Sequence, residues 1–224
     1  ILDSNSSVLF VPGDLVTMSR KYLIQSGEQD VVNDFSSIRA TRGIGRRIAY
    51  SVESTIPGPS IEALRKAGTA YPAWIDKYLQ LADVSPRVQE LASRFATSGD
   101  NAFDRAQRIE FFLRRYPFSI EIPEPALGTD VVDQYLFELR RGYADYTASA
   151  MAVLARINGV PARVASGYVS GTFDEETGRF IAGPEDSHVW VEVFFPSFGW
   201  IPFEPSGYRV PLVRQEGGGG VGVG

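Results

Sequence analysis

Hydrophobic positions in the middle of the chain repeat every three to four residues, which predicts amphipathic helices. The first predicted helix begins at Ser85-Pro86, where a serine cap precedes proline at the first helical position. The second runs from about Asn101 to Pro117. Their buried faces consist of Val88, Leu91 and Phe95, and of Phe103, Ala106, Ile109, Leu113 and Tyr116. The charged residues between these positions predict a solvated face on each helix.

A third predicted helix is more apolar than the first two and ends before Gly159 and Pro161. Its apolar positions are Ala148, Met151, Ala152 and Leu154–Ile157. Because a helix of this composition is buried on most sides, we expect it to be the central helix of the domain.

The period changes to two after that helix, which predicts strands. Val164–Val169 is predicted as a strand, Gly171–Gly183 as a loop or hairpin, and His188–Val193 as a further strand. Alternation places Val189, Val191 and Val193 on one face of the last strand, and His188, Trp190 and Glu192 on the other. Helices followed by antiparallel strands predict an α+β fold.

The residues before Pro57-Gly58-Pro59 predict a small, strand-rich segment without a catalytic motif. β-like runs occupy Val8–Phe10 and Leu15–Met18, and apolar residues alternate with polar ones around Ile48, Tyr50 and Val52. Turns are expected at Pro12-Gly13-Asp14 and near Gly43 and Gly45.

The amino-acid composition limits the classes of protein to which this chain can belong. The 224 residues are 44% hydrophobic and 22% charged, enough for one good core. The net charge is -5 and no basic stripe is present, so we expect no nucleic-acid partner. There are no cysteines, which excludes disulfides and a cysteine nucleophile in this chain. A single histidine and scattered carboxylates predict neither a metal site nor a cofactor.

His188 and Glu204 are the candidate base and carboxylate. A hairpin that closes through Pro196 to Phe198, with Val193 opposite Gly199, would set His188 opposite Glu204. Two plainer interpretations remain beside this one. A lone histidine on a strand is usually a half-buried polar contact, and Glu204 taken alone is an ordinary exposed carboxylate. Pro202 could also force a bulge and shift the register.

Four motifs between residues 142 and 205 carry a resemblance: Gly142-Tyr143-Ala144, Gly159-Val160-Pro161-Ala162-Arg163, His188-Val189-Trp190 and Gly199-Trp200-Ile201-Pro202-Phe203-Glu204-Pro205. In this order they resemble the transglutaminase-like superfamily, relatives of papain. The resemblance implies a papain-like α+β core, with a central helix packed on an antiparallel sheet after the strand-rich N-terminal segment. It places Ala144 where the family has its cysteine, His188 on the family histidine and Glu204 on the family aspartate.

Further residues resemble bacterial, membrane-anchored members of that family: Tyr71-Pro72, Tyr78-Leu79-Gln80-Leu81 and the ending Phe203-Glu204-Pro205. The resemblance implies an extracytoplasmic (periplasmic or cell-surface) domain of a membrane protein. The expected organisation is a strand-rich segment at 1–60, a transglutaminase-like domain at 61–208 and a glycine-rich tail at 209–224. The start on Ile1 and the tail fit a piece of a longer protein.

Two departures from the family pattern matter for function. Glu204 replaces an aspartate, and a carboxylate one methylene longer can still orient an imidazole. Ala144 removes the nucleophile, because a methyl group has no lone pair. Ser149 should point away from His188, and Thr147 should bond its own helix backbone, so neither is a substitute nucleophile.

Two hypotheses from different classes therefore remain. The first is a natural, catalytically inactive binding or structural module, for which a protein or peptide amide is the expected ligand. The second is a cysteine-dependent acyl transferase or amide hydrolase whose cysteine was replaced deliberately. Thr147, Ala155 and Val189 also depart from the expected pattern, which favours the first, because a designed knockout changes one residue.

Overall fold

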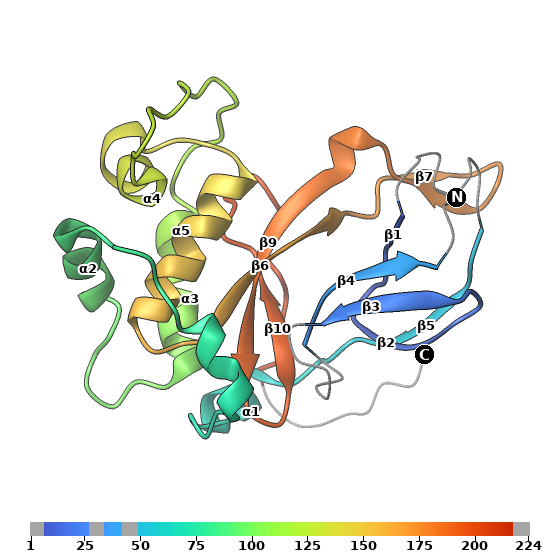
Figure 1. The fold of residues 1–224 in the computed structure, drawn as a ribbon, viewed down its shortest axis with the longest axis horizontal. Helices are drawn as coiled ribbons and strands as arrows, with labels where there is room; N and C mark the ends of the chain where they lie inside the picture. Colours follow the sequence, from blue (N-terminus) through green and yellow to red (C-terminus); the bar gives the residue numbers. More distant parts are fainter. Residues whose placement is uncertain (1–6, 27–33, 42–48, 217–224) are drawn as a thin grey trace. The chain divides into compact units, whose positions relative to one another are not determined.

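The computed structural model describes residues 7–26, 34–41 and 49–216. Its contacts separate two units, Ile1–Gly58 and Pro59–Gly224, whose elements are labelled in Figure 1. The expected turns near Gly43 and Gly45, the position of Ile48 and the tail from Gly217 lie outside the described residues.

The described part of the first unit is built from strands: β1 (Val8–Leu9), β2 (Asp14–Met18), β3 (Tyr22–Ser26), β4 (Phe35–Ala40) and β5 (Val52–Thr55). They form an antiparallel sheet in the order β1-β4-β3 and a β2-β5 pair. Leu9 and Ile38 are the buried hydrophobic residues of the described part of this unit. The Tyr50 hydroxyl donates to the Phe10 carbonyl and accepts its N–H, each at 2.9 Å. The strand-rich character was predicted, but β3 and β4 were not.

Seven helical elements precede the strands in the described part of the second unit: α1 (Ile61–Lys66), η1 (Ala73–Tyr78), α2 (Pro86–Ser93), α3 (Ala102–Leu113), α4 (Val131–Gln134), η2 (Tyr135–Leu139) and α5 (Ala144–Ile157). The predicted cap at Ser85 is confirmed, since Ser85 Oγ accepts the Val88 N–H. Asn101 caps α3 in the same way, and its Oδ1 accepts the Asp104 N–H. Phe95 and Tyr116 lie beyond the helix ends and are still buried.

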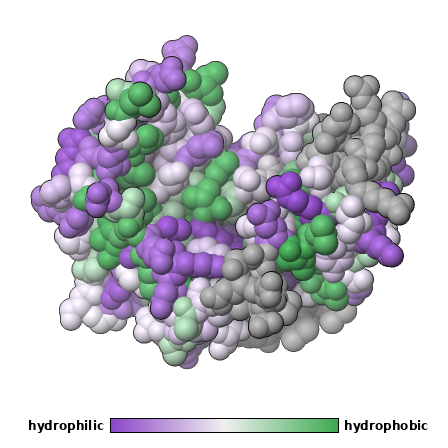
Figure 2. Space-filling model, in the orientation of Figure 1, coloured by the Kyte–Doolittle hydropathy of each residue, from purple (hydrophilic) through white to green (hydrophobic). Residues whose placement is uncertain are grey.

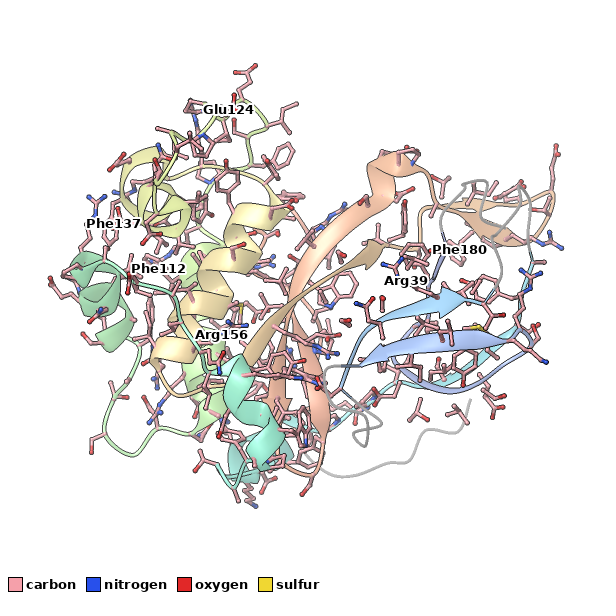
Figure 3. All side chains as sticks on the ribbon, in the orientation of Figure 1. Arg39, Phe112, Glu124, Phe137, Arg156 and Phe180 are labelled. Atoms are coloured by element: carbon pink, nitrogen blue, oxygen red, sulfur yellow. The ribbon has the colours of Figure 1, made fainter. Side chains whose placement is uncertain are left out.

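The strands of the second unit follow α5, as predicted: β6 (Ala162–Tyr168), β7 (Thr172–Asp174), β8 (Arg179–Ile181), β9 (Ser187–Phe195) and β10 (Gly199–Phe203). β10, β9 and β6 form an antiparallel sheet in that order, and β7 and β8 form a separate hairpin that carries Phe180 (Figure 3). The short helix η3 (Pro184–Asp186) leads into β9.

The hydrophobic core of the second unit lies around α5, which packs on β9 and β6 and against α2 and α3 (Figure 1). Alanines at 148, 150, 152 and 155 allow close approach of the neighbouring elements, and Met151 and Leu154 are fully buried. Burying one large aliphatic side chain stabilises the fold by about 1.5–3 kcal/mol. On the face drawn in Figure 2, hydrophilic and hydrophobic residues are mixed. Of the described helices, none combines the length and apolar character that crossing a membrane requires.

The register of the β9–β10 hairpin differs from the prediction. Gly199 pairs with Phe195, and Val193 pairs with Ile201, so the expected pairing of Val193 with Gly199 was wrong by two residues. The cause is a tight three-residue loop: Ser197 and Gly199 adopt left-handed φ angles of 69° and 76°, and the Phe198 N–H donates to the Phe195 carbonyl at 3.1 Å. Pro202 shifts nothing, since β10 is an edge strand.

A register difference of two residues keeps every side chain on the face it was expected to occupy. Val191 and Val193 still pack into the core beside α5, and Phe194 and Trp200 pack on the opposite face with Ile75. His188 and Glu204 therefore stay on one face, although they are diagonal and no longer opposite.

Candidate active site

His188 is the second residue of β9 and its backbone pairs with Gly167 of β6. The side chain is buried, with 4% of the residue exposed. Its Nε2 lies 2.5 Å from Glu204 Oε2, so the predicted hydrogen bond between the histidine and the carboxylate is confirmed. A buried imidazole needs such a partner, because an unpaired polar group in the core is costly.

Glu204 follows directly after the last residue of β10 and is 7% exposed. Its two carboxylate oxygens have different partners: Oε2 meets His188, and Oε1 accepts the Ser206 N–H at 2.9 Å. With both oxygens engaged, the carboxylate has a fixed orientation toward the ring. The longer glutamate side chain suits the diagonal position, at which cross-strand Cα atoms are farther apart than in a direct pair.

Ala144 is the first residue of α5 and is 5% exposed. The first N–H groups of a helix have no partner within the helix, so they give a partial positive charge at this point, and the Ala144 N–H faces the Tyr208 hydroxyl. Thr147 Oγ1 donates to the Ala144 carbonyl at 3.0 Å, which confirms that this hydroxyl bonds its own helix. The same oxygen lies 3.1 Å from Ser206 Oγ, so the helix start is linked to the segment after Glu204.

Tyr208 was not predicted from the sequence and contacts both parts of the site. Its ring lies edge-on to His188 with centroids 6.3 Å apart, and 4.5 Å from the Phe118 ring. Burial raises the pKa of its phenol, while the Ser206 hydroxyl, Arg209 and the Ala144 backbone N–H act in the opposite direction. Tyr208 thus lies against the backbone of Ala144 and beside His188. The only signal in the sequence is an aromatic residue four positions after Glu204.

Trp200 and Arg163 of the motifs have packing roles. Trp200 is buried against Phe194 and Ile75. Arg163 forms an ion pair with Glu192 at 2.7 Å, and its guanidinium carbon lies 4.2 Å from the Trp200 ring centroid. These contacts brace the sheet that carries His188. In the part of the chain that the structure describes, no group of three or more His, Asp or Glu side chains is placed to hold a metal ion.

The arrangement contains three of the four parts of a nucleophilic acyl-transfer site. His188 can accept a proton, Glu204 fixes its orientation, and the N–H groups at the start of α5 can bind a developing oxyanion. The fourth part, a side chain that attacks the carbonyl carbon, does not exist at Ala144.

The chain matches the family model of the transglutaminase-like superfamily over residues 89–205. It is 37% identical to the uncharacterized protein YebA of Bacillus subtilis over 169 residues, which are 70% of this chain and 23% of that protein. It is 38% identical to a protein-glutamine gamma-glutamyltransferase of Pseudomonas aeruginosa over 102 residues, 46% of this chain and 15% of that protein. The chain thus spans less than a quarter of the length of these curated relatives.

Solved structures share the fold. The periplasmic domain of TgpA from Pseudomonas aeruginosa, bound to ethylmercury, superimposes with a TM-score of 0.62 at 26% identity, covering 84% of this chain and 68% of that chain. A putative cysteine protease from Cytophaga hutchinsonii has a TM-score of 0.52 at 16% identity, covering 90% of this chain and 69% of that one. The expected fold, a papain-like and transglutaminase-like arrangement of helices and antiparallel sheet, is confirmed.

Proposed function

Because this chain belongs to the transglutaminase-like superfamily, we propose that it binds a protein or peptide amide in an acyl-transfer site that is inactive with alanine at position 144. The observation that supports this proposal is the intact, buried pair of His188 and Glu204, 2.5 Å apart, in a chain whose central helix begins with Ala144. A buried histidine and carboxylate are costly to keep in a core, so their retention fits a site that still binds.

The parent chemistry of the site is acyl transfer. A cysteine at position 144 gives its proton to His188 and attacks the carbonyl carbon of the amide, and the oxygen that becomes negative is held by the N–H groups of the helix start. His188 then returns the proton to the leaving nitrogen, and a thioester remains on the cysteine. An amine or water attacks the thioester and releases the acyl group. Glu204 holds the ring in one orientation throughout.

The substrate class follows from a relative. The Pseudomonas aeruginosa protein is named a protein-glutamine gamma-glutamyltransferase, so we propose the side-chain amide of a glutamine within a protein as the group that the site binds. The partner of the domain is then a protein or peptide with an accessible glutamine.

The second candidate is an active enzyme whose cysteine was replaced. It is favoured by the completeness of the remaining site, in which Glu204 uses both carboxylate oxygens and Thr147 and Ser206 connect its segment to α5. The native codon at position 144 distinguishes the two candidates. A cysteine codon would identify an enzyme, and an alanine codon would identify the binding module.

Ala144→Cys tests the site directly. We expect the alanine form to bind a glutamine-containing peptide and to release no ammonia from it. The restored thiol should have a pKa below the ~8.5 of free cysteine, because a helix N-terminus and an imidazolium stabilise the thiolate. Alkylation with iodoacetamide at pH 7 should accordingly be faster than for a free thiol, and His188→Ala should remove the advantage. A thiol of ordinary reactivity, indifferent to His188, would disprove the acyl-transfer site.

We also propose that the domain lies outside the cytoplasm in a membrane-anchored protein. Support comes from its similarity to the periplasmic domain of TgpA, with a TM-score of 0.62. The full reading frame is then expected to encode apolar stretches of about 20 residues beside this domain. A complete frame without such a stretch would contradict the proposal.

A further inference from the structure

The backbone of Glu204 is held on both sides by α3. The Glu204 N–H donates to Glu110 Oε1 at 2.8 Å, and Arg114 Nη1 donates to the Glu204 carbonyl at 2.7 Å. Glu110 and Arg114 are four residues apart, so they lie one above the other on the same helix face. The Glu110 carboxylate and the Arg114 guanidinium thus bind the backbone donor and the backbone acceptor of one residue, Glu204.

This contact matters because Glu204 lies outside the sheet. β10 ends at Phe203, so no strand ladder fixes the backbone of Glu204, and its position relative to β9 is diagonal. The orientation of its carboxylate toward His188 must come from elsewhere. The contacts that supply it are those with α3, together with the Ser206 N–H on Oε1.

Arg114 extends the contact along the next residues. It also donates to the carbonyls of Ser206 at 3.1 Å and Arg209 at 2.7 Å. At Gly207 a Cβ would lie 2.0 Å from the Arg114 carbonyl oxygen, so only glycine lets the segment approach α3 this closely. Arg114 uses two nitrogens of its planar guanidinium for these three carbonyls, whereas a lysine offers one nitrogen.

Glu110 is an unusual residue at its position. It is 5% exposed on an otherwise apolar helix face. Burial raises its pKa, and the Glu204 N–H, Arg214 and Arg114 oppose that rise. A buried carboxylate is unfavourable unless it is hydrogen-bonded and paired, and its hydrogen bond here goes to the backbone of Glu204.

We propose that Glu110 and Arg114 are positioning residues of the site: they hold the backbone of Glu204 so that its carboxylate meets His188. The proposal deepens the proposed function and depends on it for catalysis, but the effect on ring geometry is independent of any reaction. The hydrogen bonds of the two side chains in this region go to backbone groups and not to His188.

The first test uses the only histidine of the chain as a reporter. In Arg114→Ala, the ring nitrogen signals of His188 should change and broaden in NMR spectra, because Glu204 is no longer fixed. The matched control is Arg105→Ala, since Arg105 is another α3 arginine that donates to backbone carbonyls, those of Asn158 and Asp100, away from Glu204. The control should leave the signals unchanged. Equal spectra for the two variants would overturn the proposal.

Glu110 supplies a second pair of variants. Glu110→Gln keeps an oxygen that accepts the Glu204 N–H, so its His188 signals should resemble those of the parent chain. Glu110→Ala leaves that N–H without an acceptor and should change them. If Glu110→Gln changes the ring signals as much as Glu110→Ala, the hydrogen bond is not what positions Glu204. Arg114→Lys, which keeps the charge, replaces Arg114→Ala if the alanine variant fails to fold.

The second test is kinetic and uses the Ala144→Cys chain. Arg114→Ala should slow alkylation of the thiol and lower kcat by about 10- to 100-fold, because a misplacement of about 1 Å can cost ~100-fold. KM should stay nearly constant, since Arg114 does not touch the amide. Arg114→Lys should restore part of the rate and Arg105→Ala should leave it unchanged. A rise in KM at constant kcat would contradict a positioning role.

Failure of the proposed function and failure of the positioning role give different results. If Ala144→Cys alone has an ordinary thiol, the proposed function fails, while the ring signals of His188 still show whether α3 positions Glu204. If the thiol is reactive and Arg114→Ala keeps that reactivity, the positioning role fails and the proposed function stands.

Discussion

At the scale of single residues, Glu204 determines whether the site is intact. It is the hydrogen-bond partner of a buried histidine, and it also receives the Ser206 N–H. A carboxylate in this place keeps His188 oriented, and the extra methylene of glutamate covers the diagonal distance between β9 and the end of β10. Its neighbour Tyr208 covers one edge of the His188 ring.

Shortening the Glu204 side chain should destabilise the domain less than removing it. Glu204→Ala leaves His188 buried without a partner and should lower the free energy of unfolding by about 1–3 kcal/mol. Glu204→Asp should be less destabilising, but its carboxylate should lose either His188 or the Ser206 N–H. Urea unfolding and the ring signals of His188 measure the two effects. An aspartate variant with unchanged ring signals would show that the longer side chain is not required.

The residues that sequence could predict are those whose role is encoded locally. His188, Glu204 and Ala144 lie in short motifs, and the back-bond of Thr147 follows from the geometry of its own helix turn. Glu110 and Arg114 could not be found in this way, because they resemble the solvated face of an amphipathic helix and acquire their role only when residues 90 positions later fold against them. Tyr208 belongs to the same class of long-range contacts.

At the scale of elements, the β9–β10 hairpin places Glu204 near His188 and depends on one glycine. Gly199 has a φ of 76°, and no heavy atom lies within 4 Å of where its Cβ would be, so a substitution there tests backbone strain alone. Sequence predicted the hairpin but not its register, because the conformation of a three-residue loop decides the register and the periodicity of the strands does not.

Gly199→Ala should destabilise the domain by about 1–2 kcal/mol, the cost of a left-handed conformation for a residue with a side chain. Gly58→Ala is the matched control: nothing lies within 4 Å of its Cβ position either, and its φ is outside the left-handed region. The control should be neutral or slightly stabilising. Differential scanning calorimetry measures the transition temperatures of the two variants. Equal temperatures would contradict the expected backbone strain at position 199.

The hydrogen bonds between Asp133 of α4 and Arg87 and Ser85 at the start of α2 should stabilise the domain to a degree that depends on pH. Asp133 accepts hydrogen bonds from Arg87 Nε at 2.7 Å and from Ser85, the cap residue of α2. The hydrogen bond from Arg87 is the main cause that lowers the pKa of Asp133, and Ser85 adds to it against the effect of burial. Because the folded pKa is the lower one, the stabilisation is present above the unfolded value near 3.9 and is lost as pH falls through the folded value.

Asp133→Asn should therefore lower the melting temperature at pH 7, and the difference from the parent chain should shrink as the pH falls below about 4. Melting curves by circular dichroism at pH 7 and at about pH 3 measure this. A difference of the same size at both values would show that packing of the side chain, and not its charge, is responsible.

At the scale of the whole molecule, the buried clusters of the described residues each belong to one unit, and the small cluster of Ile75, Phe194 and Trp200 lies in Pro59–Gly224. The large cluster of buried residues around α5 comes entirely from the unit Pro59–Gly224, and the cluster of Leu9 and Ile38 comes entirely from the unit Ile1–Gly58. Neither cluster needs residues of the other unit, and the His188–Glu204 pair belongs to the larger one.

A chain of residues 59–216 should therefore fold alone, unfold in one cooperative transition and keep the His188 ring signals of the full chain. Calorimetry and NMR on the shorter chain measure this. Loss of the transition on removing residues 1–58 would mean that the first unit is needed for folding of the second.

The hairpin register also limits how this site can vary among relatives. His188 and Glu204 share a face because they are 16 positions apart, an even step, in a hairpin where residues of equal parity pair and Glu204 follows directly after β10. Inserting or deleting one residue in the paired part of the hairpin would turn the carboxylate to the other side of the sheet, whereas a change of two would leave it on the histidine side. Among relatives, we therefore expect the paired part of the hairpin between the histidine and the carboxylate to differ in length by two residues at a time. A single inserted or deleted residue is expected in the turn or in a bulge.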